Sequence, residues 1–204
     1  MKKLLTFSIA ALAMNFAKAQ YCIPTYTNSC TNVFTDRVEF AGIDNNPAGT
    51  GCNGNPDSYI FYSNDTAKVA QGGSYPIILT PTILNGVGFG VWIDFNADND
   101  FADAGEFVLS SAPGTDPVSG SINIPVSATI GNTRMRVRCI FSVTPAAGDS
   151  CNNQSWGETE DYHISIQLQP PNDIGVIAIN APDTGCGLTA TDSVTVSVYN
   201  FGSA

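Results

Sequence analysis

An acidic segment at residues 94–106 carries the side chains best suited to chemistry in this chain of 204 residues. Five carboxylates occur within these thirteen residues, so the segment repels itself unless an arginine, a lysine or a bound metal supplies positive charge. The candidate ligand atoms are all oxygens, which favours a hard cation, and a flexible loop suits Ca²⁺ better than Mg²⁺. We therefore predict a structural calcium site, whose ligands are Asp94, Asn96, Asp98, Asp100, Asp103 and Glu106.

The spacing in this acidic loop is partly that of a helix–loop–helix calcium site. Asp94, Asn96 and Asp98 match its first three ligand positions. Asn99 stands where glycine is usual, although asparagine tolerates the left-handed conformation, and Glu106 comes one residue after the usual place of the bidentate glutamate. Because strands rather than helices are expected on both sides, a solvated acidic turn is the alternative.

Short β-type runs separated by turn signals extend from residue 33 to residue 168, and no helical period accompanies them. This pattern predicts an all-β protein whose domain at 20–168 is an antiparallel, jelly-roll-like β-sandwich, with a closed barrel as the alternative. After a linker at 169–172, strands at 174–179 and 194–198 predict the incomplete beginning of an Ig-like domain at 173–204. The expected strands of the sandwich are 37–43, 58–62, 76–80, 88–95, 106–109, 121–124, 133–143 and 161–168.

Arginines alternate with apolar residues in the strand expected at 133–143. Arg134, Arg136 and Arg138 share one face, and Met135 and Val137 share the other, which packs inward. The arginines are therefore predicted to form an exposed ladder that pairs with acidic neighbours, and an anion-binding stripe is the alternative.

The last expected strand places carboxylates on both of its faces. Glu158 and Glu160 share the parity of its apolar core positions, so both are expected to point inward and to meet an arginine or complete the metal site. Asp161 then faces outward, near the arginines, unless a bulge reverses the faces. Trp92 has the opposite parity to its apolar neighbours, so it is either an exposed ligand platform or part of a strand buried on both sides.

The N-terminal residues indicate export. Residues 1–19 have two lysines near the start, Lys2 and Lys3, then an apolar run and the small–x–small sequence of a signal peptide, which contains a third lysine, Lys18. The formal net charge is −10, or −13 without this leader, which argues against nucleic-acid partners. No later stretch is long and apolar enough for membrane insertion. The protein is therefore predicted to be secreted or held at the cell surface.

Export makes disulfides plausible among the six cysteines. Fifteen pairings exist, so the sequence does not define the connectivity. One assignment pairs Cys30 with Cys52 and Cys22 with Cys151, and it leaves Cys139 and Cys186 without partners. Catalysis is not expected, because the single histidine, His163, supports neither a zinc hydrolase nor a nucleophilic serine.

Three ordered motifs resemble the GEVED domain family over residues 21–168. They are 92–96 leading to 105–106, the arginine strand 133–138, and Gly-Glu-Thr-Glu-Asp-Tyr at 157–162, where Thr159 replaces the usual valine. The tail at 173–204 is similar to the start of a CARDB-like adhesion domain. The resemblance implies a non-catalytic module of a larger exported bacterial protein, often one with type IX sorting signals, that serves adhesion or accessory binding to a surface glycan or protein. A spacer for a downstream catalytic domain such as a peptidase, or a weak carbohydrate-binding module, is the alternative.

Overall fold

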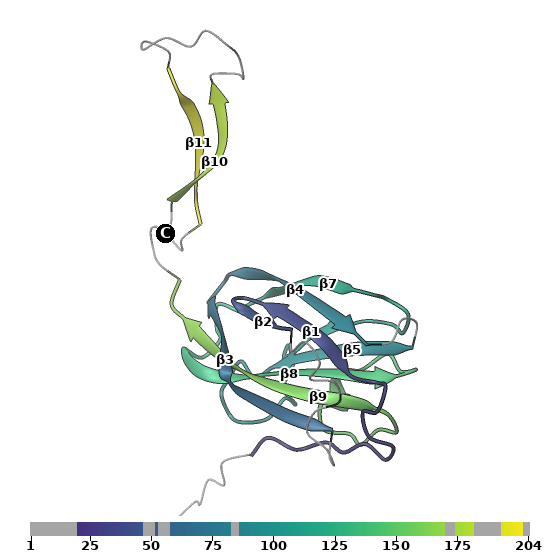
Figure 1. The fold of residues 1–204 in the computed structure, drawn as a ribbon. Helices are drawn as coiled ribbons and strands as arrows, with labels where there is room; N and C mark the ends of the chain where they lie inside the picture. Colours follow the sequence, from purple (N-terminus) through teal and green to yellow (C-terminus); the bar gives the residue numbers. More distant parts are fainter. Residues whose placement is uncertain are drawn as a thin grey trace, which may run out of the picture.

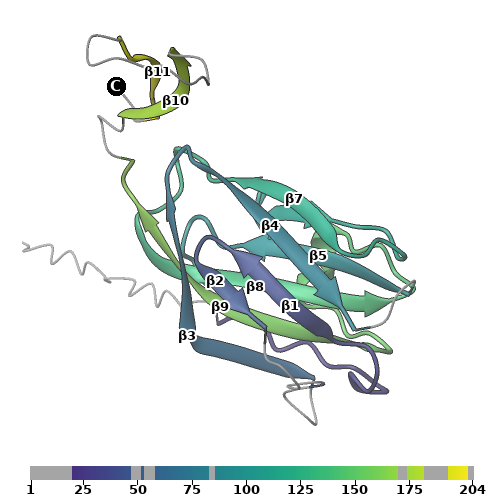
Figure 2. The ribbon, with the colours of Figure 1, turned by 45° about the horizontal axis from the view of Figure 1, so that its top comes forward.

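The computed structural model describes residues 20–46, 52, 58–82, 86–169, 174–181 and 193–201, so the predicted leader lies outside it. Two sheets face each other as a sandwich (Figures 1 and 2). Their strand orders are β2-β1-β4-β7 and β3-β9-β8-β5-β6. All neighbouring strands are antiparallel except β3 and β9, which confirms the predicted all-β class. The strands are β1 Thr35–Phe40, β2 Ile43–Asn45, β3 Tyr59–Ala70, β4 Ser74–Pro81, β5 Val87–Ile93, β6 Phe107–Ser110, β7 Val118–Asn123, β8 Gly131–Phe141 and β9 Gly157–Gln167.

The strand boundaries differ from the expected ones mainly at turns. The strand expected at 37–43 is divided by a tight turn at Ala41 and Gly42, whose φ angles are +44° and +95°, and its two parts pair as β1 and β2. The last strand begins four residues earlier than expected, at Gly157. The acidic residues that follow Gly157 therefore belong to the centre of the sheet, between β8 and β3.

The hydrophobic core lies between the two sheets. Alternate residues of each strand point into it, as the period of two requires. In β8 these residues are Met135, Val137 and Cys139, all fully buried. They pack with Val38, Phe40, Ile77, Leu79, Phe89, Val91, Ile93, Ile122, Tyr162, Ile164 and Ile166.

The outer face of the five-stranded sheet is also covered. Residues 20–34 run beneath this sheet in Figure 1 and pair with the connection between β8 and β9, which contains a short 3₁₀ turn, Ala147–Ser150. The amide of Thr27 donates to the carbonyl of Gln154, and the Cys22–Cys151 disulfide joins the two segments. We call residues 20–34 and 142–156 the cover. A second disulfide joins Cys30 to Cys52, and these are the two pairings considered from the sequence.

Strands β10, Ile174–Ala181, and β11, Thr195–Asn200, form a separate antiparallel hairpin beyond β9 (Figure 1). Most of their apolar side chains are exposed, including those of Ile174, Ile179 and Val198. A two-stranded hairpin is at best marginally stable alone in water. Within the described part of the chain, no helix is long and apolar enough to cross a membrane.

Candidate functional site

The acidic loop connects β5 to β6 at one end of the five-stranded sheet. Its base is held by backbone and side-chain hydrogen bonds: the amide of Asp94 donates to the carbonyl of Arg134, and the Thr133 hydroxyl donates to the carbonyl of Asp94. Asn99 has a φ of +75°, the left-handed conformation that glycine usually supplies in calcium loops. The loop is thus anchored to the start of β8, and its tip extends outward.

Two of the six predicted ligands lie beneath the loop rather than in its acidic cluster. The Asp94 side chain is fully buried and accepts hydrogen bonds from the amides of Ala97 and Asn99, at 2.6 and 3.1 Å. The Glu106 side chain accepts one from the amide of Phe95 at 2.9 Å. Both carboxylates therefore hold the shape of the loop, because each already satisfies backbone N–H groups that would otherwise be buried without partners.

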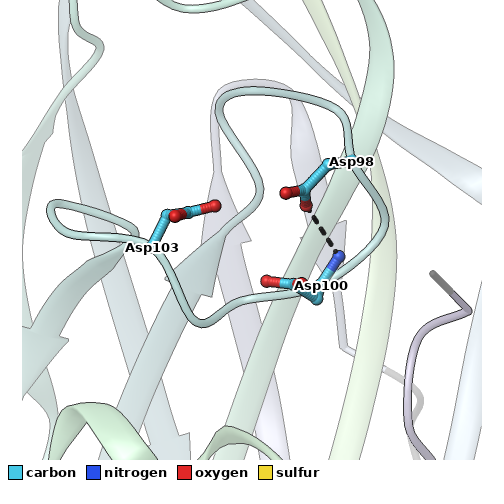
Figure 3. A group of neighbouring side chains, drawn as sticks. All are labelled: Asp98, Asp100 and Asp103. Atoms are coloured by element: carbon cyan, nitrogen blue, oxygen red, sulfur yellow. Dashed lines mark hydrogen bonds between the residues drawn. The ribbon is translucent and has the colours of Figure 1, made fainter.

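The remaining acidic ligands form one cluster, Asp98, Asp100 and Asp103. A carboxylate oxygen from each lies within 4.8 Å of the others, and Figure 3 shows the three side chains around a common space. The Asn96 side-chain amide donates to Asp98 at 3.1 Å and to Asp103 at 2.7 Å. This arrangement offers several oxygen ligands to a hard cation, the donor type that Ca²⁺ requires.

Glu106 should give the protein a measurable pH dependence. Burial raises its pKa from an ordinary value of 4.5 to about 7. A carboxyl whose pKa is raised in the folded state stabilises the fold at pH values below its unfolded-state pKa. This contribution is lost as the pH rises through its folded-state pKa. We expect wild-type unfolding midpoints, measured in EDTA, to fall more between pH 4.5 and 7 than those of Glu106→Gln. Parallel curves for the two proteins would contradict this.

The predicted exposed arginine ladder is wrong for two of its three members. Arg136 and Arg138 are fully buried, because the cover lies over their face. Arg136 donates to the carbonyls of Cys22 and Ser150, both at 2.8 Å. Arg138 donates to the carbonyls of Asp149 and Asn152 and to the hydroxyl of Tyr26.

Asp161 pairs with Arg136 and, more weakly, with Arg134 across β8 and β9, on the outer face where the strand period placed it. Its two oxygens accept from Nε and Nη2 of Arg136, both at 2.8 Å, and neither side chain is exposed. Arg134 reaches the same carboxylate at 3.4 Å. The Arg136–Asp161 pair is therefore a bidentate ion pair sealed between the sheet and the cover.

Glu158 and Glu160 point into the sandwich, because β9 pairs with β8 in a continuous register. Glu158 accepts a hydrogen bond from the amide of Thr35 at 3.0 Å. Glu160 accepts one from the Tyr162 hydroxyl at 2.7 Å, so among the described residues a tyrosine, rather than the predicted arginine, is its hydrogen-bond partner. Burial and the neighbouring Glu158 carboxylate raise the pKa of Glu160, which favours a protonated, neutral side chain.

Trp92 is not an exposed platform. It is fully buried beneath the cover, and its indole N–H donates to the carbonyl of Ala147 at 2.9 Å. The tryptophan at the surface is Trp156, 36% exposed, which lines a shallow apolar groove with Phe141 and Val33. Trp156 lies in a connection between strands, where the strand period of two does not apply. The sequence therefore did not indicate that this tryptophan is exposed.

The comparison with protein families covers the part of the chain that contains these features. Residues 88–165 match the GEVED domain model. The match runs from β5 to β9 and contains the acidic loop, the arginine strand and the Gly157–Tyr162 motif. Among curated proteins, none matches the chain. The GEVED match indicates a domain of a larger protein, and nothing in the comparison supports a CARDB-like domain after it.

Proposed function

We propose that residues 20–168 form a non-catalytic, calcium-stabilised GEVED module of a larger exported protein, at the cell surface or secreted, where it serves adhesion or accessory binding. The observation that carries the calcium assignment is the convergence of Asp98, Asp100 and Asp103 around one space. The two disulfides support export, because such bonds persist in oxidising compartments. A spacer that presents a downstream catalytic domain is the alternative.

The tail fits the same proposal. The apolar side chains exposed on both strands of the β10–β11 hairpin need neighbours, and further strands of an Ig-like adhesion domain, as the resemblance to CARDB domains implies, would supply them. Type IX secretion is part of this proposal and rests on the family resemblance alone.

Calcium should raise the unfolding temperature of the purified, disulfide-intact protein. A ligand at one hundred times its dissociation constant adds about 2.7 kcal/mol to the free energy of unfolding. For a domain of this size the midpoint then rises by several degrees. We expect this rise with Ca²⁺ after EDTA treatment and a smaller one with Mg²⁺, since Mg²⁺ gives up its water ligands reluctantly.

Two matched variants make the calcium test specific. Asp98→Asn removes one carboxylate of the cluster and should abolish most of the shift. Asp36→Asn removes an exposed carboxylate from β1, outside the loop, and should leave the shift intact. If Ca²⁺ does not move the wild-type midpoint, or moves both variants equally, the loop is a solvated turn and the calcium assignment fails.

A further inference from the structure

A small polar cavity lies at the start of β8, outside the acidic cluster. Its volume is about 170 Å³. None of its lining residues is acidic, although acidic residues outnumber basic ones by 18 to 8 in the chain. We call it the Arg134 cavity, and it is lined by Tyr21, Asn99, Asn132, Thr133, Arg134 and His163.

Arg134 differs from the other two arginines of its strand because its guanidinium is accessible. Its side chain is 20% exposed, and it lies against the rings of Tyr21 and Phe61, 4.2 and 4.1 Å from their centroids. Its one hydrogen bond to the described residues runs from Nη1 to Asp161. Nε and Nη2 therefore keep their donor capacity while the two rings fix the plane of the guanidinium.

The local charges leave Arg134 incompletely neutralised. The Asp161 carboxylate already makes two short hydrogen bonds to Arg136, and its contact to Arg134 is longer, at 3.4 Å. The Asp94 carboxylate accepts a hydrogen bond from the Tyr21 hydroxyl at 2.5 Å. Two backbone amides also donate to Asp94 and disperse its charge. A planar guanidinium with open donors is suited to bind an oxyanion.

The other polar groups of the cavity indicate what should surround that oxyanion. The side chains of Asn99, Asn132 and His163 make no hydrogen bond to any described residue. Amide and imidazole groups donate and accept, so they suit hydroxyl groups beside the charge. We propose that the Arg134 cavity binds the carboxylate of an acidic sugar residue, such as a uronate, with Arg134 as the anchor and the three side chains holding ring hydroxyls.

The probe for this proposal is a galacturonate trisaccharide, titrated into the purified protein by calorimetry in EDTA, so that no bound Ca²⁺ can bridge the carboxylate of the sugar to the acidic loop. The neutral methyl ester of the same trisaccharide is the matched ligand. We expect the acid to bind at least about tenfold more tightly than the ester, because charge-assisted hydrogen bonds are about twice as strong as neutral ones. Equal binding of the two, or no heat with either, would overturn the proposal.

Variants locate the binding. Arg134→Gln should weaken uronate binding about tenfold or more, and Arg134→Lys should restore part of it. Arg37→Gln removes an exposed arginine that is already paired with Glu39 and Asp44, and it should leave binding unchanged. If Arg134→Gln does not fold, Asn132→Ala, which removes no hydrogen bond of the fold, should still weaken binding. Wild-type affinity in Asn132→Ala, or displacement of the trisaccharide by equimolar inorganic sulfate, would contradict sugar recognition.

Discussion

Asp161→Asn should lower the free energy of unfolding by about 3–5 kcal/mol, because it leaves the buried Arg136 guanidinium without its negative partner. The substitution preserves size, removes the charge and replaces one of the two acceptor oxygens with an NH₂ donor, which the Arg136 guanidinium cannot use. Arg136 is fully buried beneath the cover, so water does not replace the lost interaction. Urea unfolding, followed by tryptophan fluorescence, measures the loss, since Trp92 packs on the same sheet face.

Asp44→Asn is the matched control for this prediction. Asp44 also forms a bidentate ion pair with an arginine, Arg37. This pair lies at the surface, where solvent screens the interaction. Its loss should have little effect on unfolding. If both substitutions cost the same, the Arg136–Asp161 pair contributes no more than a surface contact, and the sealed geometry has no energetic role.

Removal of the Cys22–Cys151 disulfide, by alanine at both positions, should lower the free energy of unfolding by about 2–5 kcal/mol. The bond joins residues 129 positions apart, so it restricts the unfolded chain strongly. It also fastens the cover over Arg136 and Arg138. We therefore expect limited proteolysis near residues 20–34 before the sandwich itself is cleaved.

The second disulfide provides an internal comparison. Cys30 and Cys52 are 22 positions apart, and loop entropy predicts a loss about 1.5 kcal/mol smaller when both are replaced by alanine. Chemical unfolding of the two double variants, at equal concentration and pH, tests this order. A reversed order would show that loop length does not set the relative contributions of the two disulfides.

Strand periodicity alone assigned the two faces of β8 and β9. Met135 and Val137 point inward, Arg136 and Asp161 point outward, and Glu160 points inward, as alternation requires. Periodicity does not say whether an outer face is covered. That depends on residues 20–34 and 142–156, which have no regular pattern and meet only through tertiary contacts. The opposite parity of Trp92 to its apolar neighbours was the available signal, because a tryptophan in a central strand is usually buried.

The sequence analysis treated the acidic loop as one set of six ligands. In the structure, two of the acidic side chains are buried beneath the loop and three form the acidic cluster. Asp94 directly follows the buried strand β5, and Glu106 directly precedes β6, so both lie where backbone amides need acceptors. Asp98, Asp100 and Asp103 lie in the segment between them and remain together. Spacing identifies oxygen ligands, but it does not say which carboxylates the loop uses to fold itself.

Cys139 has a consequence for how the protein acquires its disulfides. Its thiol lies between the sheets, with no exposed surface, and burial raises its pKa well above the ordinary value. Thiol–disulfide exchange proceeds through the thiolate, so this cysteine becomes unreactive once β8 has paired with β5 and β9. Pairing of these strands thus withdraws a competing nucleophile before it attacks Cys22–Cys151 or Cys30–Cys52. Oxidative folding that begins with the sheet is protected from scrambled bonds through Cys139, whereas oxidation of the extended chain is not.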